Sequence, residues 1–213
     1  MFLLILALAV FVIYRISCTL PNRKHAVTPA KTKSLAVFLG SGGHTSEALA
    51  LISALDFNRY SPRTYVISEG DSFSAQKTCE LESSKETTTC PAQYTLLTIP
   101  RARRVHQSLV TTPPTALYSL LLCIYYITFA RTSFADVLIL NGPGTCFVLC
   151  IAVYVNKFFG LAAPRVIYIE SFARVESLSL SGKLLFPFVD RFIVQWQQLQ
   201  EKEKGAEFHG LLV

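Results

Sequence analysis

A glycine-rich turn near residue 40 carries the residue types that bind phosphate. It stands between a short apolar run and a helical segment, and it consists of Gly40, Ser41, Gly42, Gly43, His44 and Thr45. Glycines allow a tight turn that aims backbone N–H groups outward, and the N-terminus of the following helix adds partial positive charge. We therefore predict a diphosphate-binding loop here, although a glycine turn after a first strand can also be only a turn.

This turn matches two common nucleotide-binding motifs poorly. It is not a P-loop, because no Gly-Lys-Ser/Thr follows the glycines. Thr45 occupies the place of the third glycine that the dinucleotide-binding fingerprint needs for close packing of helix on strand. Glu69, near the end of the next strand, could still hold a ribose, so a dinucleotide cofactor stays an alternative at this point.

Two further polar segments are expected at the same place. The first contains Asn141, Gly142, Pro143, Gly144 and Thr145. The second follows the segment Arg165–Glu170, where Glu170 should enter the crevice beside Ser171, with Arg174 a turn further on. Ligands of open α/β sheets bind at the carboxyl ends of the strands, so all three segments should line one crevice. Arg174 either binds the ligand or forms an ion pair with Glu170.

Short β-branched runs alternate with helical segments after residue 34. Strands are predicted at Leu35–Leu39, Arg63–Ser68, Tyr94–Ile99, Val137–Asn141, Arg165–Glu170 and Arg191–Val194, and helices at His44–Leu55, Thr115–Ala130 and Thr145–Phe159. This alternation predicts an α/β fold with a Rossmann-like parallel sheet over residues 35–213. The polar stretch Glu69–Gln93 interrupts it and is interpreted as a surface insertion.

The first twenty residues predict a transmembrane anchor. Met1–Leu20 is apolar except for Arg15, and the sum of insertion free energies favours the bilayer. A cleaved signal peptide is the alternative, but the basic n-region is missing. Basic residues follow up to Lys33 with no acid before Glu47, which favours a single-pass topology with the body in the cytosol. Residues 1–20 are thus expected to form the anchor and residues 21–34 a basic linker.

The charge and the cysteines limit the partners. A net charge of +6 suits a phosphate-rich or membrane-surface partner, whereas no RNA-binding motif is present. The basic segment Arg101–His106 and the uncharged helix Thr115–Ala130 form either a solvated loop with a core helix or a surface that lies on the bilayer. The six cysteines show no CxxC pair, so we expect neither a metal site nor a cofactor.

The motifs GSGGHTSE, NGPGT, YIESFARV with LSLSGK, and DRFIVQW occur in this order. Together they resemble the asparagine-linked glycosylation fourteen family. The resemblance implies one lobe of a two-lobed GT-B-type glycosyltransferase, the membrane subunit of the UDP-N-acetylglucosamine transferase of dolichol-linked oligosaccharide synthesis. It implies a cytosolic site on the endoplasmic reticulum membrane, where a second N-acetylglucosamine is added to dolichyl-diphosphate-N-acetylglucosamine. It also implies a separate catalytic subunit that binds the donor.

The resemblance places the turn at residues 40–45 against the acceptor diphosphate. His44 is then a candidate for phosphate contact or for the base that removes the acceptor proton, because imidazole can be neutral near pH 7. A helix cap is its alternative role, and Glu170 is the other candidate base.

The end of the chain predicts the partner contact. About twenty residues follow the last predicted strand, too few for a second lobe, so we expect no activity from this chain alone. The apolar terminal residues Leu211, Leu212 and Val213 are predicted to bind the catalytic partner, with burial inside this domain as the alternative. Two other functions stay open, a membrane-tethered nucleotide-dependent oxidoreductase and a scaffold without site residues.

Overall fold

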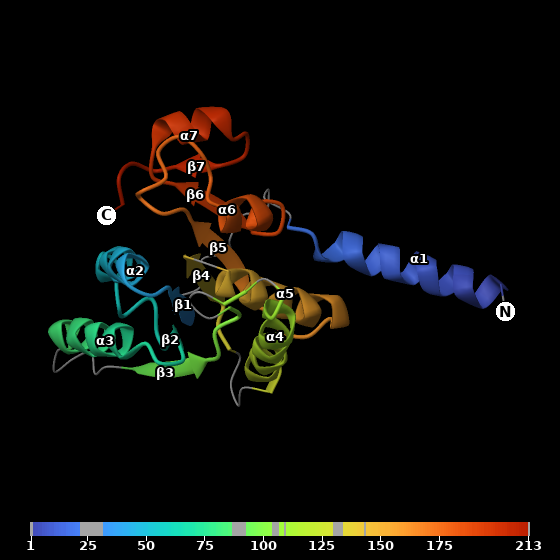
Figure 1. Ribbon diagram of the computed structural model, residues 1–213, viewed down its shortest axis with the longest axis horizontal. Coiled ribbons are helices and arrows are strands. Elements are labelled where there is room, and N and C mark those ends of the chain that lie inside the picture. The colour runs from blue at the N-terminus through green and yellow to red at the C-terminus, as the bar shows by residue number, and fades with distance from the viewer. Residues whose placement is uncertain are drawn as a thin grey trace.

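The computed structural model of the protein describes residues 2–21, 32–86, 93–103, 107–108, 110–129, 134–142 and 144–212. Its centre is a seven-stranded sheet with the order β3-β2-β1-β4-β5-β6-β7, in which all neighbouring strands are parallel (Figure 1). The strands are β1 (Leu35–Leu39), β2 (Arg63–Ser68), β3 (Tyr94–Ile99), β4 (Val137–Asn141), β5 (Arg165–Ile169), β6 (Arg191–Val194) and β7 (Glu207–Phe208). The predicted α/β fold with a parallel sheet is therefore confirmed.

Helices cover both faces of this sheet. The structure contains the helices α1 (Phe2–Thr19), α2 (Gly43–Ser53), α3 (Ser72–Lys85), α4 (Thr112–Phe129), α5 (Thr145–Phe159), α6 (Leu180–Leu185) and α7 (Gln197–Lys202), of which all except α1 cover the sheet. Helices α2 and α3 pack on one face, while α4 and α5 pack on the other together with α6 and α7 (Figure 1). The central strand β1 is buried along its whole length, which explains its continuous apolar sequence.

The order of the strands reverses between β1 and β4. From β1 the chain continues outward through β2 to β3, and from β4 it continues in the opposite direction through β5 to β7. The register pairs Leu39 with Asn141, so the two central strands end side by side. The connections on the two sides therefore diverge here, at the place where open α/β sheets bind their ligands.

The predicted surface insertion at Glu69–Gln93 is wrong for most of its length. Helix α3 occupies this stretch, and the Asp71 side chain caps its start by accepting a hydrogen bond from the Ser74 N–H. The side chains that α3 buries are polar: Ser74, Thr78 and Glu82. An amphipathic pattern was not visible because the stripe facing the protein contains hydroxyl and carboxyl groups instead of apolar ones.

The buried face of α3 is stabilised by an ion pair. The Arg63 guanidinium on β2 donates to both carboxylate oxygens of Glu82, at 2.7 and 2.8 Å. Tyr65 donates a further hydrogen bond to the same carboxylate, and burial raises the pKa of its phenol well above the ordinary value. Pairing of this kind offsets the cost of burying the charges.

The N-terminal helix α1 forms where the apolar segment predicted it, and it projects from the body (Figure 1). Among the residues that the structure describes, no helix is both long enough and apolar enough to cross a membrane, so the predicted span is not confirmed. The basic linker at residues 21–34 lies almost entirely outside the described residues, which resume at residue 32.

Arg15 has a definite structural position at the junction of α1 and α5. Its guanidinium donates hydrogen bonds to the carbonyl oxygens of Phe158, at 2.8 Å, and Lys157, at 2.9 Å. These carbonyls belong to the last turn of α5, where a cation is favourable to the helix dipole. The single charge in the apolar segment therefore attaches α1 to the body.

Candidate functional site

The turn between β1 and α2 presents glycine backbone at the start of a helix. Ser41, Gly42 and Gly43 are exposed, and no side chain caps the start of α2. Gly42 has a φ of +67° and a ψ of −125°, a conformation that side chains with a Cβ disfavour. The first N–H groups of a helix have no partner within it, so this turn is suited to bind an anion.

The Thr45 side chain holds this turn from its buried side. It is fully buried, its hydroxyl donates a hydrogen bond to the carbonyl of Gly40, and it lies 2.6 Å from Ser74 Oγ on α3. Thr45 therefore connects the glycine turn to the helix that the sequence did not reveal. Its side chain points into the protein and not toward a ligand in the crevice.

The two predicted glycine turns touch each other. Gly142 has a φ of +123°, and a Cβ at this position would lie 3.4 Å from the Gly40 Cα and 3.4 Å from the His44 ring. Gly144 is exposed at the start of α5, and Thr145 is buried. The starts of α2 and α5 therefore meet at one place, as expected from their positions after adjacent strands. Pro143 lies outside the described residues.

His44 is oriented by a fully buried amide. Its Nδ1 lies 2.9 Å from Asn141 Oδ1, and Asn141 Nδ2 donates a hydrogen bond to Glu47 Oε2 at 3.2 Å. An ionised carboxylate can only accept hydrogen bonds, so the amide must present its nitrogen to Glu47 and its oxygen to His44. His44 then carries its proton on Nδ1, which leaves Nε2 of the neutral ring with a free lone pair.

Glu47 completes the network and was not among the predicted site residues. Its second carboxylate oxygen accepts a hydrogen bond of 2.9 Å from Ser171 Oγ, in the loop after β5. Residues His44, Asn141, Glu47 and Ser171 thus form one connected chain across the ends of three strands. The spacing of Glu47 three residues after His44, on the same side of a helix, was the available signal.

Glu170 lies close to this network but is held by a different set of contacts. It is 1% exposed, and its carboxylate accepts hydrogen bonds from the Ser171 N–H at 3.0 Å and from the N–H and hydroxyl of Ser179 at 2.9 and 3.0 Å. A Cβ on Gly182 would approach Glu170 Oε2 to 2.3 Å. This packing favours a role in ordering the loop between β5 and α6 over a role as the base.

Arg174 lies on that loop and is exposed. Within the described ranges, the ion pair with Glu170 that the sequence suggested as one alternative is not among the salt bridges. The carboxylate of Glu170 is instead satisfied by backbone and serine donors. Binding of a ligand by Arg174 therefore stays a prediction.

Part of the basic segment after β3 is joined to the start of α5. The Ala102 N–H donates a hydrogen bond of 3.4 Å to Thr145 Oγ1, and the Thr115 hydroxyl donates one of 3.0 Å to the Ala102 carbonyl. These bonds fix the backbone between Arg101 and Arg103 beside the second glycine turn. Residues 104–106 lie outside the described residues.

One buried polar atom at this end of the sheet has no hydrogen-bond partner among the described residues. Gln195 follows β6 directly and is 1% exposed; its Nε2 donates to the Glu170 carbonyl at 3.3 Å, whereas its Oε1 is unpaired. Gln195 belongs to the motif DRFIVQW but was not among the predicted site residues. It contributes a free acceptor near the loop that carries Ser171.

The C-terminal residues separate into two kinds. Leu212 packs against the apolar cluster formed by β1 and α2, whereas the side chain of Leu211 is 60% exposed. Val213 lies outside the described residues. Internal burial thus applies to Leu212, and only Leu211 of the two is free for another chain.

Known proteins resemble this chain in sequence and in fold. The family model described as "Oligosaccharide biosynthesis protein Alg14 like" matches residues 35–212. The UDP-N-acetylglucosamine transferase subunit ALG14 of Cryptococcus neoformans var. neoformans (serotype D, strain JEC21) is 48% identical over 186 residues, which cover 84% of this chain and 80% of that protein. The Homo sapiens protein of the same description is 40% identical over 210 residues, covering 97% and 94% of the two chains.

Among solved structures, the crystal structure of Acinetobacter baumannii MurG superposes with a TM-score of 0.53 at 12% identity. The match covers 84% of this chain but only 44% of MurG, so it shows a shared fold over less than half of that protein. The family match confirms the resemblance that the ordered motifs indicated. Because it includes most of the chain, from β1 to the C-terminal segment, this protein belongs to the Alg14-like family of oligosaccharide biosynthesis proteins.

Proposed function

We propose that this protein is the acceptor-binding subunit of a UDP-N-acetylglucosamine transferase and works with a separate catalytic subunit. The relatives named as subunits of such a transferase support this proposal. The likeness to MurG over less than half of that chain is consistent with a lobe that needs a second one. The observation that carries the proposal is the meeting of the two glycine turns beside the His44–Asn141–Glu47–Ser171 network.

The proposed acceptor is dolichyl-diphosphate-N-acetylglucosamine, which receives a second N-acetylglucosamine. Its diphosphate would lie against the exposed backbone of Gly42, Gly43 and Gly144, where the positive ends of α2 and α5 converge. Arg101 and Arg103 add positive charge beside this place. Metal ions are not required for this contact, since backbone N–H groups and arginines can neutralise the diphosphate.

In the proposed reaction, His44 Nε2 takes the proton from the attacking hydroxyl of the acceptor. The oxygen then forms a bond to the anomeric carbon of the donor, while the bond to the UDP oxygen breaks and UDP leaves with the bonding electrons. Asn141 stabilises the imidazolium that results, because its Oδ1 already accepts from Nδ1. Glu170 orders the loop and does not touch the reacting atoms, and the catalytic subunit binds UDP.

We further propose that the body is attached to the cytosolic face of the endoplasmic reticulum membrane. Helix α1 exposes large apolar side chains such as Leu3, Val10 and Ile13. Helix α4 exposes a second apolar stripe that contains Leu117, Leu121 and Tyr125, while Ser119, Cys123 and Ile127 on its other side are buried. Apolar surface of this extent on two helices favours contact with lipid.

The proposal is tested by a transferase assay on copurified complexes. The assay measures transfer of radiolabelled N-acetylglucosamine from UDP-N-acetylglucosamine to the lipid-linked acceptor. It is run with this chain alone, with its partner alone, and with the two together. We expect transfer only by the complex, and His44→Gln should lower its kcat about 10²- to 10⁴-fold. The exposed His209, which contacts Glu207, provides the control variant His209→Gln.

Normal turnover of the His44→Gln complex would remove His44 as the base. If substitutions at His44, Asn141 and Gly42 all left turnover normal in an assembled complex, the chain would be a scaffold.

A further inference from the structure

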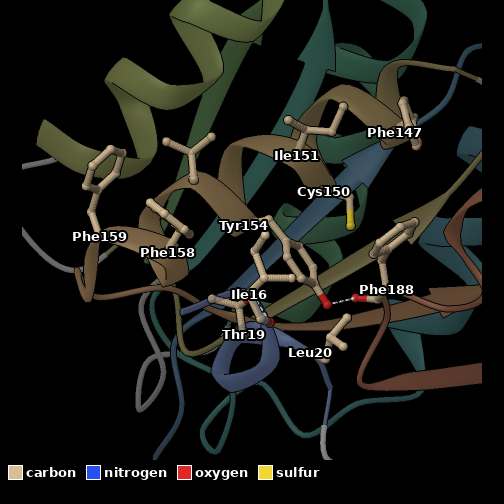
Figure 2. A pocket seen from close by; sticks show the side chains of 11 residues that line it. Ile16, Thr19, Leu20, Phe147, Cys150, Ile151, Tyr154, Phe158, Phe159 and Phe188 are labelled. Carbon is tan, nitrogen blue, oxygen red and sulfur yellow. Dashed lines mark hydrogen bonds between the residues drawn. The ribbon is translucent and has the colours of Figure 1, made fainter. Parts of the chain in front are cut away.

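An apolar cavity of about 340 Å³ lies between α1 and α5 (Figure 2). Helix α5 forms its long wall with Phe147, Ile151, Tyr154 and Phe158, and Ile16 and Leu20 close it at the end of α1. Among the residues that the structure describes, no charged side chain lines the cavity. The Tyr154 hydroxyl donates a hydrogen bond of 2.6 Å to the Phe188 carbonyl, so a ligand does not need to supply an acceptor for it.

The wall on α5 runs along one side of that helix. Its side chains recur every three or four residues, which is the spacing of one helix face. Phe147 and Phe158 are eleven positions apart, so the wall extends for about 16 Å along the helix axis. The cavity is therefore an elongated groove, and its shape suits a chain more than a compact ring system.

One end of this groove lies in the first turn of α5, the helix whose start belongs to the candidate diphosphate site. Phe147 stands two residues after Thr145, in the first turn of α5, where Gly144 is exposed. The other end reaches the last turn of α5, where Arg15 fixes α1 to the Phe158 carbonyl. A ligand with its diphosphate at the start of α5 would thus direct whatever is attached to that diphosphate along the helix and toward α1.

We propose that this groove holds the first isoprene units of the polyprenyl diphosphate acceptor. This inference rests on the proposed function, and it adds a binding site for the hydrocarbon next to the diphosphate. An apolar groove that begins at the phosphate-binding turn fits the lipid of such an acceptor, whose chain starts at the diphosphate. In a bilayer phospholipid, glycerol separates the phosphate from the acyl chains. A phospholipid with its phosphate at this turn would therefore not place an acyl chain directly at the start of the groove.

The groove should make the transferase sensitive to the length of the acceptor lipid. A chain of one or two isoprene units leaves most of the apolar wall exposed to water, whereas a longer chain covers it. Burial of apolar surface then lowers the KM for long acceptors. The chemistry at the sugar hydroxyl is unaffected, so kcat should not depend on chain length in the same way.

The test compares two acceptors with the assembled complex. One carries a two-isoprene chain on its diphosphate-N-acetylglucosamine and the other carries a long polyprenyl chain. Ile151→Trp fills the groove from the α5 wall, and Phe73→Trp, at a 45% exposed position on α3, is the matched control. In Ile151→Trp we expect the ratio of the long-chain KM to the short-chain KM to rise at least about tenfold, while Phe73→Trp keeps the wild-type ratio.

A second measurement detects binding directly, without a variant and without an assay of transferase activity. The full chain in detergent is irradiated with farnesyl diphosphate that carries a benzophenone, and the adducts are located by mass spectrometry. We expect adducts on the peptide that contains Phe147–Phe158, displaced by unlabelled polyprenyl diphosphate and not by phosphatidylcholine.

The outcomes separate this inference from the proposed function. If the wild-type complex transferred sugar to neither acceptor, the proposed function itself would be rejected. Transfer to both acceptors with an unchanged KM ratio in Ile151→Trp, or adducts only outside α5 and α1, would overturn the groove alone. Equal displacement of the adducts by phosphatidylcholine would also overturn it, since the occupant would then be an ordinary acyl chain.

Discussion

At the scale of single residues, the glycine turn after β1 contains two neighbours that differ in backbone conformation alone. A Cβ would find nothing within 4 Å at Gly42 or at Gly43, but only Gly42 has a positive φ. A substitution at Gly43 therefore tests steric blockage of the ligand, whereas a substitution at Gly42 adds strain in the backbone. The function of the turn, in this view, depends on a conformation that one glycine provides.

The first prediction compares Gly42→Ala with Gly43→Ala. The alanine at position 42 should strain the turn by about 1–3 kcal/mol and redirect the N–H groups, because L side chains rarely adopt a φ of +67°. We expect the KM for the acceptor to rise about tenfold or more in Gly42→Ala and to change much less in Gly43→Ala. Equal effects of both variants would show that space for the ligand, and not backbone conformation, is decisive.

A second residue-scale prediction concerns Glu47, whose carboxylate forces Asn141 to present its oxygen to His44. Glu47→Gln keeps the shape of the side chain but can donate as well as accept, so the Asn141 amide is free to turn over. His44 would then lose its fixed tautomer. We expect kcat to fall at least about tenfold while the KM for the acceptor stays close to that of the wild type.

The tautomer itself can be observed by nitrogen NMR of the imidazole ring. The wild type should show the proton on Nδ1, and Glu47→Gln should show a mixture. An unchanged spectrum together with normal kcat would mean that the network does not orient the base.

At the scale of elements, α1 and α4 are the two helices that we propose to contact the membrane. Arg15 fixes α1 to the end of α5, and α4 presents its apolar stripe on the same side of the sheet as α5. A single attachment through α1 is therefore not the only option that the fold provides. The two helices can be tested separately.

The corresponding prediction uses removal of residues 1–20, alone and combined with Leu121→Glu. The shortened chain should stay folded, because the sheet and its covering helices do not include α1. Sedimentation with membranes should weaken on truncation and be lost when Leu121→Glu is added, since a charge opposes insertion of the α4 stripe. Phe73→Glu on α3 serves as the control for the added charge.

Complete retention of the truncated chain after a carbonate wash would mean that a segment other than α1 is embedded in the bilayer. Full release by truncation alone would assign the attachment to α1 and remove α4 from it.

At the scale of the whole molecule, the proposed function requires a surface that joins this single lobe to a partner. The C-terminal segment extends from β7 toward α2, and Leu212 returns to the apolar cluster of that face while Leu211 points outward. The segment thus has one residue that packs on its own domain and one that is exposed, and we propose that the exposed one contacts the partner. This division replaces the simpler expectation that the last residues act alike.

We therefore predict different results for Leu211→Asp and Leu212→Asp. Leu211→Asp should abolish recovery of the catalytic subunit and leave the thermal midpoint of this chain nearly unchanged, because the side chain is 60% exposed. Leu212→Asp should lower the free energy of unfolding by about 1–3 kcal/mol, because it places a charge against the apolar cluster. Undiminished recovery of the partner with Leu211→Asp would contradict the assignment.

The sequence by itself determined the order of the elements. Strands β1, β2, β3, β4 and β6 match their predicted bounds, and β5 ends one residue earlier. The central strands were visible because buried parallel strands are continuous apolar runs. The two glycine turns could also be predicted from the sequence, because the positive φ angles at Gly42 and Gly142 favour glycine. Helix α3 was missed because its buried side is polar, and the two-residue strand β7 is too short to give a pattern.

Only the tertiary structure decided how the site residues are connected. His44 and Asn141 are 97 positions apart and Glu47 and Ser171 are 124 apart, so no local pattern could report their hydrogen bonds. Glu170 and Ser171 are neighbours in sequence, yet the Glu170 carboxylate accepts from Ser179 and the Ser171 hydroxyl donates to Glu47, because the loop that follows β5 directs the two side chains to different partners. Packing likewise created the groove beside α5, since its two walls, on α1 and α5, lie far apart in the sequence.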